Sequence, residues 1–559
     1  MNSRETYAAW RTRAQSGLPL DDYRLLGKTA NENGEALLAF DIAREGLETW
    51  ANDKELRLIM ALAHARMGST GRARNLLLQV RSEGHGDEET LGLLARTYKD
   101  LWLRSGSTQD LKAAFDEYRK AYNRLPDRYW TGINAATLAF ALRDGQTAGE
   151  LAGQVLETCE ARRRAADGAK DYWVLATMAE AKLIQNKVDG AEALYREARA
   201  VGRPGNILST WRNARILLRL MPPSVRARME QALRPPKVAV FEGDWNGDPT
   251  GLNAHLLEVG VGIAYSLARS DADLAFLEAM QSIGGQTYIV LPYNEQQFVE
   301  DWVNTSGTQW EERYRKVRGS ADSLIVCSEQ KLKFGNVGDE YAYDMLRGLA
   351  RLRAAYLDTE QVFIGKSASR AAITSIGLPG FGAERRAMMF ADAFRFSSLS
   401  EEQIPAFITE VMERIATLSR NLEPKPEYSN TWGDGLFFVF ATVAQAGRFA
   451  LEVSTSVAAI DRKSAGLPEE LALRIGLHAG PVYKFVDQIT GRENYIGTHV
   501  NRAARIEPIT PPGGIFASDA FAALASVEAP QQFQFDYVGR IPLAKSFGEF
   551  SVFELRAGR

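Results

Sequence analysis

The first 232 residues show the hydrophobic pattern of helices. In LRLIMALAHARMG and LGLLARTYKDLW, apolar residues and alanines recur every three or four positions, which is the spacing of one helix face. Three segments, MGSTGRARNLLLQV, LRDGQTAGELAGQVLE and NKVDGAEALYREA, each place a glycine shortly before an alanine-rich helix. Small residues such as Ala73, Ala148 and Ala193 let paired helices pack closely. The region is therefore predicted to be an α-solenoid of stacked helix pairs.

The pattern changes after Arg234, where Pro235 and Pro236 disfavour helix continuation. Three apolar runs then read as buried strands, namely KVAVF at 237–241, QTYIVLPYN at 286–294 and DSLIVCSEQ at 322–330. A helical run is expected near 255–269. Strands that alternate with helices predict a doubly wound α/β domain over residues 237–375, in which ligands bind at the carboxyl ends of the strands.

Residues 365–384 are rich in small residues and read as a linker. After it, RAMMFADAFRFSSLS begins as an apolar strand and turns polar after Asp392. In NTWGDGLFFVF, Asp434 lies between two glycines and before an apolar run, which taken alone indicates a hairpin turn. If the two strands pair, both carboxylates meet at one sheet edge. They then repel each other unless a divalent cation such as Mg²⁺ or Mn²⁺ lies between them.

Two later segments carry further polar candidates. In HVNRAARIE, Asn501 and Arg505 are four positions apart and share one helix face. An amide and a guanidinium on one face suit a ribose and a phosphate, and the alternative is a solvated face with an ion pair. In IPLAKSFGEFSVFELR, Lys545 lies between two predicted strands and offers another phosphate contact.

Composition narrows the class of protein. The chain has 559 residues, 67 basic and 70 acidic, with a net charge of −3, so neither nucleic acid nor an anionic membrane is an expected partner. Cys159 and Cys327 are far apart and suit a reducing cytosol, and five scattered histidines form no zinc motif. The N-terminus lacks the apolar core of a signal peptide, and no apolar run approaches 18 residues. The expected location is the cytoplasm.

Residues 1–232 resemble tetratricopeptide repeats in the three segments quoted above. The resemblance implies a concave platform for a protein partner, for self-association or for sensing, and the alternative is a plain helical domain. ADLAFLEAMQSIGGQTYIVLPYNEQQFVEDWV resembles the Rossmann-like nucleotide-sensor domains related to lysine-decarboxylase-like proteins. Ser270 and Asp271 stand where such domains usually have a glycine-rich turn, which argues against a ligand role.

Residues 385–559 resemble a class III nucleotidyl cyclase catalytic domain, an α+β fold of ferredoxin-like type. The motifs that carry the resemblance are FADAFRFSSLS, NTWGDGLFFVF, LRIGLHAGPVY and GTHVNRAARIEPITPPGGIFAS, in this order. The resemblance implies that Asp392 and Asp434 bind two metal ions per site, Mn²⁺ or Mg²⁺, with the backbone of Ala393 as a further ligand. The substrate it implies is a nucleoside triphosphate.

The same resemblance assigns the remaining catalytic residues. It implies that Asn501 orients the ribose, that Arg505 stabilises charge on the α-phosphate, and that Lys545 holds the terminal phosphates, although Ser546 stands where glycine is common. Such cyclases work as head-to-tail dimers in which one chain supplies the metals and the other the asparagine and arginine. A homodimer with two shared sites is therefore expected.

Three positions depart from the purine-reading patterns of this family. Asn430 and Asn494 stand where adenylate cyclases have a lysine and an aspartate, and Arg395 stands where the motif usually has glycine. Arg395 precedes Phe396, which matches a residue at the base pocket. A guanidinium there would shrink the pocket, and asparagine can read O4 of uracil or N4 of cytosine. The sequence thus predicts a pyrimidine cyclase that makes cyclic UMP or cyclic CMP.

Such enzymes are similar in domain type to those of Pycsar anti-phage systems, in which a separate effector protein responds to the cyclic nucleotide. Two alternatives stay open. The first is an adenylate cyclase that makes cyclic AMP, has regulatory N-terminal domains and tolerates these substitutions. The second is a non-enzymatic sensor scaffold whose cyclase-like domain only dimerises.

Overall fold

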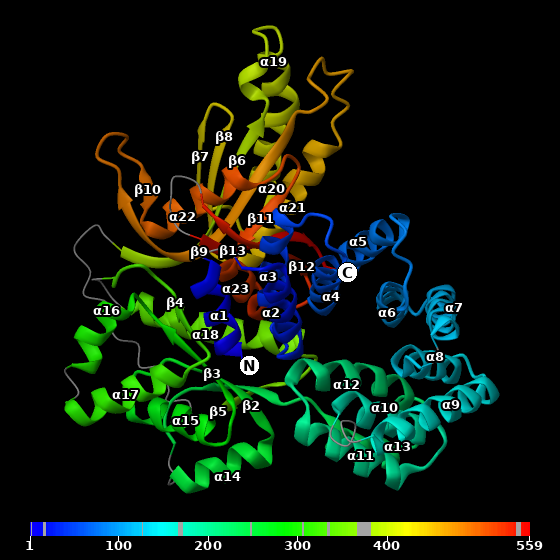
Figure 1. Ribbon diagram of the computed structural model, residues 1–559. Coiled ribbons are helices and arrows are strands. Elements are labelled where there is room, and N and C mark those ends of the chain that lie inside the picture. The colour runs from blue at the N-terminus through cyan, green and yellow to red at the C-terminus, as the bar shows by residue number, and fades with distance from the viewer. Residues whose placement is uncertain are drawn as a thin grey trace. The chain divides into compact units, whose positions relative to one another are not determined.

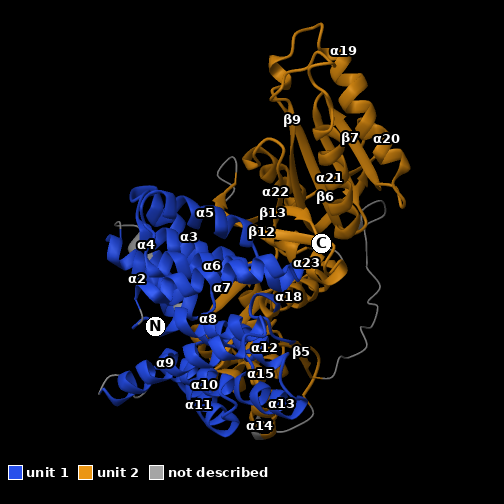
Figure 2. Ribbon diagram, turned by 90° about the vertical axis from the view of Figure 1, so that its right-hand side faces the viewer, with its two compact units in different colours: residues 1–236, 355–360 blue, residues 237–354, 361–559 orange. Residues whose placement is uncertain are grey.

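The computed structural model describes residues 1, 3–14, 18–125, 127–165, 171–245, 249–304, 307–332, 336–365, 382–543 and 549–558. These residues divide into two compact units (Figure 2). One unit comprises residues 1–236 with 355–360, and the other comprises residues 237–354 with 361–559. The division at 236/237 falls at the two prolines, while the boundaries of the three domains stay a prediction.

The first unit is helical throughout its described part, as the hydrophobic spacing predicts. Its helices are α1 (Ser3–Ala14), α2 (Leu20–Glu32), α3 (Ala36–Thr49), α4 (Lys54–Arg66), α5 (Thr70–Ser82), α6 (Glu88–Ser105), α7 (Thr108–Arg124), α8 (Tyr129–Ala141), α9 (Gly145–Arg164), α10 (Tyr172–Ile184), α11 (Val188–Val201), α12 (Pro204–Leu218) and α13 (Pro223–Leu233). Helices adjacent in sequence contact each other, for example α6 with α7, α8 with α9 and α10 with α11.

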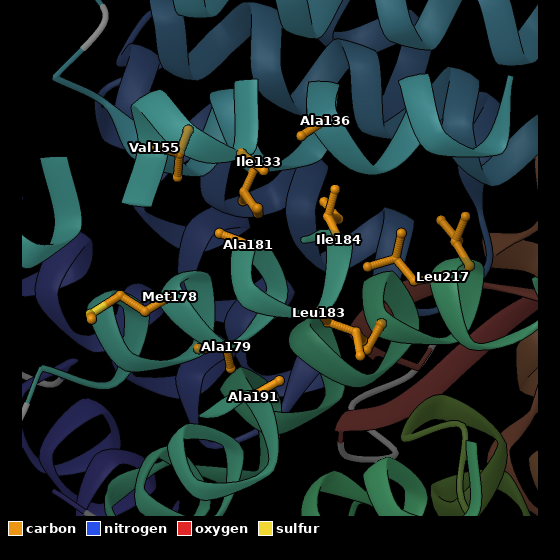
Figure 3. Close-up of a cluster of buried hydrophobic side chains, with 14 of the residues drawn as sticks. Ile133, Ala136, Val155, Met178, Ala179, Ala181, Leu183, Ile184, Ala191 and Leu217 are labelled. Carbon is orange, nitrogen blue, oxygen red and sulfur yellow. The ribbon is translucent and has the colours of Figure 1, made fainter. Parts of the chain in front are cut away.

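Short polar side chains set where several of these helices begin. Asp53, Asp87 and Ser107 each accept a hydrogen bond from a backbone N–H of the first turn that follows them, which satisfies a donor that the helix leaves unpaired. Small residues then allow close packing. A methyl group at Gly132 of α8 would lie 2.6 Å from Val155 of α9. Figure 3 shows the resulting core of alanine and branched aliphatic side chains from α8 to α12.

The second unit contains two sheets, and the first is parallel (Figure 1). Its strands, in the order β4-β3-β2-β1-β5, are β1 (Lys237–Phe241), β2 (Val261–Ser266), β3 (Gln286–Leu291), β4 (Ser323–Val326) and β5 (Gln361–Ile364). Between them run α14 (Pro249–Val259), α15 (Asp271–Ser282), α16 (Glu295–Phe298), the π-helix η1 (Val299–Val303), α17 (Thr308–Ser320) and α18 (Val337–Tyr356). The alternation of strands and helices predicted for this region is confirmed.

One prediction for this region is wrong. The helix expected near 255–269 ends at Val259, and β2 follows it directly. Gly260 adopts a positive φ of 80°, a conformation that ends a helix and that glycine adopts without strain. The apolar run that follows is too short for periodicity to distinguish a buried strand from a helix.

The N-terminus of α15 is closed by the chain itself. The side chain of Ser270 caps the helix, and the carboxylate of Asp273 accepts hydrogen bonds from Ser266 Oγ and from the backbone N–H groups of Arg269 and Ser270, all at 2.9 Å. A helix N-terminus is where an anionic ligand would bind in such a domain. The buried carboxylate occupies that position, in keeping with the argument against a ligand role there.

The second sheet is mixed and spans the C-terminal part of the unit. Its strands, in the order β12-β13-β11-β9-β6-β8-β7 with β10 on β9, are β6 (Gly382–Phe394), β7 (Tyr428–Trp432), β8 (Gly435–Phe440), β9 (Ala472–Val486), β10 (Glu493–Ile496), β11 (Ile515–Ser518), β12 (Phe533–Pro542) and β13 (Glu549–Ala557). Only β9 and β11 pair in parallel within these described strands.

Helices complete this α+β region. They are the 3-10 helix η2 (Phe396–Ser398), α19 (Ile404–Phe407), the π-helix η3 (Ile408–Met412), α20 (Glu413–Asn421), α21 (Val443–Ala458), α22 (Thr498–Ile506), the 3-10 helix η4 (Glu507–Ile509) and α23 (Asp519–Glu528). The predicted linker at 365–384 lies almost entirely outside the described residues. Among the helices that the structure describes, none combines the length and hydropathy needed to cross a membrane.

Candidate active site

The two aspartates predicted to bind metal come together because their strands pair. β6 and β8 are antiparallel neighbours, with Ala391 opposite Leu436, so the end of β6 lies beside the turn that begins β8. That turn has two residues, because Trp432 pairs with Gly435. Gly433 has φ of 71°, and a positive φ at the first turn position alone is the II′ pattern of tight hairpins. Asp434 is thus both a turn residue and a neighbour of Asp392.

The carboxylate of Asp392 raises the cost of ionising Asp434. Burial, the charge of Asp392 and a hydrogen bond to Asp392 raise the pKa of Asp434 to about 6, and a backbone hydrogen bond from Ala393 partly offsets this rise. Two neighbouring carboxylates are stable only when they share a proton or when a cation lies between them. Carboxylate and backbone oxygens are the ligands that Mg²⁺ and Mn²⁺ prefer. The residues present therefore fit a divalent cation held by Asp392, Asp434 and the Ala393 carbonyl.

The protein part of such a site is small. Among the described residues, no group of three or more His, Cys, Asp or Glu side chains is arranged to hold a metal ion. A site with two carboxylates leaves several coordination positions open, and in nucleotide enzymes the substrate phosphates commonly fill them.

Arg474 and Glu507 belong to this site, although the sequence analysis did not single them out. Arg474 pairs with Asp392 across β9 and β6, and its guanidinium lies 2.6 Å from Asp392 and 2.9 Å from Glu507. Burial raises the pKa of Glu507 to about 7, the charge of Arg474 lowers it, and Asp392 and Asp434 raise it further. The positive charge of Arg474 therefore lies between two acidic groups, Asp392 and Glu507. The alternation of LALRIG along β9, which places Arg474 on the face of the sheet opposite to that of Leu473 and Ile475, was the available signal.

Arg395 is the first residue after β6 and has a strained backbone. Its φ of 74° and ψ of 7° place it in the left-handed region, which costs a non-glycine residue about 1 kcal/mol. This conformation explains physically why glycine is the usual residue at this position of the resembling motif. The guanidinium carbon of Arg395 lies 5.6 Å from the centre of the Phe394 ring, and the Phe396 ring packs on Phe407 with centroids 4.9 Å apart.

These residues line one cavity of about 430 Å³. Its lining comprises Asp392, Ala393, Phe394, Arg395, Phe396, Ser397, Ser398, Asp434 and Arg474. The volume falls in the range of small-molecule sites, roughly 300–1,000 Å³. Among the predicted site residues that the structure describes, the metal-binding residues Asp392, Ala393 and Asp434 therefore lie together. Arg395 and Phe396 of the base-recognition residues line the same cavity. Asn501, Arg505, Asn430 and Asn494 do not line this cavity.

Asn501 and Arg505 lie on α22, as the spacing predicts, and α22 packs on β9. A methyl group at Gly480 would lie 2.2 Å from the His499 ring, and one at Gly476 would lie 2.6 Å from the backbone of Glu507. Both glycines thus allow the helix to approach the strand closely. Asn501 is exposed, whereas the Nε of Arg505 is buried without a hydrogen-bond partner among the described residues.

A buried polar chain crosses beneath α22. Nε2 of His478 lies 2.8 Å from Nδ1 of His499, and Nε2 of His499 lies 3.0 Å from Oγ of Ser328, which follows β4 of the parallel sheet. Burial lowers the pKa of both histidines well below the usual value, so the chain is neutral. The hydroxyl of Tyr341 on α18 also donates to the Ala479 carbonyl at 3.1 Å. Contacts from the parallel-sheet region therefore reach the helix that carries Asn501 and Arg505.

A second group of predicted residues gathers around one apolar cluster. Tyr428 of β7, Tyr495 of β10 and Ala503 of α22 belong to the same cluster, and the two tyrosine rings are 5.9 Å apart. Asn430, Asn494, Asn501 and Arg505 lie within two residues of these positions along the chain. The residues around the acids and these four residues are named the two half-sites here, because none of the four lines the cavity of the acids. Lys545 lies outside the described residues.

Two family models match parts of the chain. Residues 382–555 match the family model "Adenylate and Guanylate cyclase catalytic domain". The C-terminal region is a class III nucleotide cyclase domain. Residues 39–139 match "Tetratricopeptide Repeats-Sensor", so the predicted resemblance to tetratricopeptide repeats is confirmed over that range. None of the curated proteins searched matches the chain at a significant level.

Solved cyclase structures also match the cyclase domain. The guanylate cyclase domain of RhGC from Catenaria anguillulae in complex with GTP is 20% identical and covers 32% of this chain and 100% of its own, with a TM-score of 0.28. The adenylyl cyclase CyaB from P. aeruginosa is 15% identical and covers 32% of this chain and 97% of its own, also with a TM-score of 0.28.

The contacts of Arg474 lead to a prediction about stability. Arg474→Met would leave the partly buried carboxylates of Asp392 and Glu507 without their cation, so we expect the free energy of unfolding to fall by about 1–3 kcal/mol in metal-free buffer. Urea denaturation followed by circular dichroism measures this difference. Arg448→Met, an exposed arginine on α21 of the same domain, is the matched control and should change stability by less than about 0.5 kcal/mol. Equal stabilities for the two variants would contradict the role given to Arg474.

Proposed function

We propose that the chain converts a pyrimidine nucleoside triphosphate, UTP or CTP, to its 3′,5′-cyclic nucleotide and pyrophosphate. The observation that carries the cyclase activity is the meeting of Asp392 and Asp434 at one end of the β6–β8 pair, in a cavity of the size of a nucleotide site. We propose further that the cyclic nucleotide is an alarm in anti-phage defence, read by a separate effector protein. The resemblance to pyrimidine cyclases of such systems supports this role.

The proposed reaction is an intramolecular displacement. The ribose 3′-oxygen attacks the α-phosphorus, the bond from that phosphorus to the bridging oxygen of the β-phosphate breaks, and pyrophosphate leaves. The hydroxyl proton passes to solvent. Two divalent cations, Mg²⁺ or Mn²⁺, held by Asp392, Asp434 and the Ala393 backbone, would lower the pKa of the 3′-hydroxyl and neutralise the leaving group. Asn501 would orient the ribose, and Arg505 would stabilise charge on the α-phosphate.

The separation of the two half-sites supports a homodimer with shared active sites. The cavity that holds Asp392 and Asp434 includes neither Asn501 nor Arg505 among its described lining. A second copy placed head to tail would bring its own α22 to that cavity and would create two equivalent sites. The guanidinium of Arg505 would then contact a phosphate oxygen of the nucleotide held by the acids of the opposite protomer. Lys545 would hold the terminal phosphates.

Arg395 is the main support for a pyrimidine substrate. Its side chain lines the cavity together with Phe396 and the two acids, so it reduces the room for a base and presents fixed donors that suit the O2 carbonyl of a pyrimidine. The strained backbone at Arg395 also points to function, because strain at a site persists where it contributes to the site. Asn430 and Asn494 would read the base edge from the other half-site.

An adenylate cyclase is the second candidate, and one observation favours it. Oδ1 of Asn494 accepts from the Tyr495 backbone N–H at 2.8 Å, and its Nδ2 lies 3.4 Å from Asp487. A side chain engaged in this way has less capacity to read a base, and Asn494 is then a substitution that an ATP-binding site tolerates. A non-enzymatic scaffold is less well supported, because Asp392, Asp434, Asn501 and Arg505 are all retained.

The helical repeats would serve as the platform for a protein partner or for sensing. The match to "Tetratricopeptide Repeats-Sensor" supports this assignment. The Rossmann-like character proposed for residues 237–375 is supported by the all-parallel sheet.

The substrate is tested directly by product analysis. Purified protein is incubated with Mn²⁺ and with ATP, GTP, CTP or UTP separately, and the products are identified by mass. We expect cyclic UMP or cyclic CMP, and we expect Asp434→Asn to lower turnover by ~100-fold or more because it removes a charged metal ligand. Asparagine tolerates this turn position, so the variant should melt no lower than the wild type. Cyclic AMP as the sole product would contradict the pyrimidine assignment. The absence of a cyclic product from all four triphosphates would contradict the proposed cyclase activity.

Arg395→Gly tests the basis of substrate choice. Glycine removes the backbone strain, so we expect the free energy of unfolding to rise by about 1 kcal/mol. Loss of the guanidinium enlarges the base pocket, so the ratio of kcat/KM for ATP to that for UTP or CTP should rise by ~10-fold or more, which corresponds to about 1.4 kcal/mol of discrimination. The control is Arg448→Ala. Glycine is not used at this position because Arg448 lies within α21, and glycine inside a helix is itself destabilising. An unchanged ratio would show that Arg395 does not select the base.

A further inference from the structure

The helical unit contains a cavity that the proposed cyclase chemistry does not use. Its volume is about 470 Å³, within the range of roughly 300–1,000 Å³ for small-molecule sites. It lies where the end of α4, the second half of α6 and α12 meet the segment 355–360, all within the same compact unit. Its described lining includes five arginines, namely Arg66, Arg104, Arg212, Arg215 and Arg219, against two aspartates, Asp100 and Asp358.

Arg66 is buried in this cavity wall without an acidic partner. Its side chain donates to the Asn31 carbonyl, to the Gly205 carbonyl at 3.1 Å and to Ser209 Oγ at 3.1 Å, all of which are neutral groups. Its Nε has no hydrogen-bond partner among the described residues. Burial, together with the charges of Arg96 and Arg212, lowers the pKa of Arg66 to about 9, and the charge of Glu32 offsets only part of this fall. The positive charge is therefore poorly compensated.

Each of the two acids of the cavity lies close to an arginine other than Arg66 or Arg212. Asp358 pairs with Arg215 at 2.6 Å, and Asp100 lies 3.8 Å from Arg96 one turn earlier on α6. Arg212 donates instead to the carbonyl of Tyr356 at 3.2 Å. Burial and then repulsion from Arg96 lower the pKa of Arg212, and the charges of Asp100 and Asp358 partly offset this fall.

Another buried arginine in the same unit shows the usual arrangement. The side chain of Arg57 is 5% exposed, and its guanidinium forms two hydrogen bonds to the carboxylate of Glu83, one of them at 2.8 Å. The hydrogen bonds to Glu83 raise the pKa of Arg57. A purely structural arginine is thus matched by a carboxylate here. Arg66 and Arg212 depart from that pattern, because neither forms a hydrogen bond to a carboxylate among the described residues.

We propose that this cavity binds a small molecule that carries two or more phosphate groups, such as a nucleoside diphosphate. Guanidinium groups recognise phosphate oxygens through paired N–H donors. The lining has a surplus of three positive charges, five arginines against two aspartates, which exceeds the charge of a single carboxylate and suits a diphosphate. Binding would be favourable because the phosphate charge would compensate Arg66 and Arg212, which are removed from water.

The site also touches the end of a helix that reaches the cyclase domain. Tyr356 is the last residue of α18, and the Arg212 and Arg215 contacts hold Tyr356 and Asp358. Earlier on the same helix, Tyr341 bonds to Ala479 and Asp344 pairs with Arg385 at 3.1 Å. A diphosphate that takes over Arg212 and Arg215 would loosen their bonds to this segment, so occupancy of the cavity would be sensed at α18.

The test is calorimetric titration of the full-length chain with inorganic pyrophosphate and, separately, with ADP. Asp434→Asn is included as background and EDTA is present, so that metal-dependent binding at the cyclase cavity is absent and the result does not depend on the proposed function. We expect one site per chain, with an affinity that falls as salt rises. Arg212→Met should weaken binding at least 10-fold, and Arg212→Lys should weaken it less. Arg196→Met, which removes an exposed arginine of α11, is the matched control and should bind like the parent.

The melting temperature without ligand separates loss of the site from loss of the fold. Because Arg212 is a poorly compensated charge, Arg212→Met should melt no lower than the parent. Three results would overturn the proposal: no binding of either probe, equal binding by Arg212→Met and the parent, or an Arg212→Met protein that melts well below the parent and so shows a structural role.

Discussion

The cyclase domain depends on the position of β6 between two antiparallel neighbours. On one side β8 brings the Gly433–Asp434 turn to Asp392, and on the other side β9 brings Arg474 to the same carboxylate. The register of a strand with one buried face is strongly specified, because a shift by one residue would turn every side chain to the opposite face. A slip of β6 would therefore separate Asp392 both from Asp434 and from Arg474. The site is a consequence of strand register rather than of loop conformation.

The close approach of α22 to β9 is the second constraint. Gly476 and Gly480 allow it, since a methyl group at either position would clash with η4 or with His499. His478 and His499 then form a neutral buried chain that ends at Ser328. Buried polar chains of this kind are rigid when every member is satisfied. The orientation of Asn501 and Arg505 thus rests on groups from both sheets of the second unit.

Charge that the fold leaves uncompensated marks both sites described above. Asp434 carries a raised pKa beside Asp392, which suits a cation, and Arg66 and Arg212 carry lowered pKa values beside each other, which suits an anion. The buried Arg57, by contrast, is paired with Glu83. Arg395 adds backbone strain at the cyclase cavity. Such local costs persist where a ligand or a reaction offsets them.

Much of this organisation could be predicted from the sequence, and the remainder could not for physical reasons. Helical spacing predicted the repeats, and the apolar runs before Asp392 and after Asp434 predicted the strands that bring them together. β2 was missed because a six-residue apolar run beside a helix has no distinguishing period. Arg474 and Glu507 were missed because their role arises from cross-strand register and from a close backbone approach. The arginine cavity combines residues up to 293 positions apart, Ala65 to Asp358, which no local pattern reveals.

The most direct test of shared active sites is complementation between two inactive chains. Asp434→Asn removes one half-site and Arg505→Ala the other, so neither homodimer should turn over nucleotide. Co-expression with two different tags, followed by tandem purification, yields heterodimers with one intact site and one site that lacks both residues. We expect purified heterodimers to recover about half of the wild-type activity per dimer. Heterodimers that co-purify but remain inactive would contradict the account, as would full activity of either variant alone.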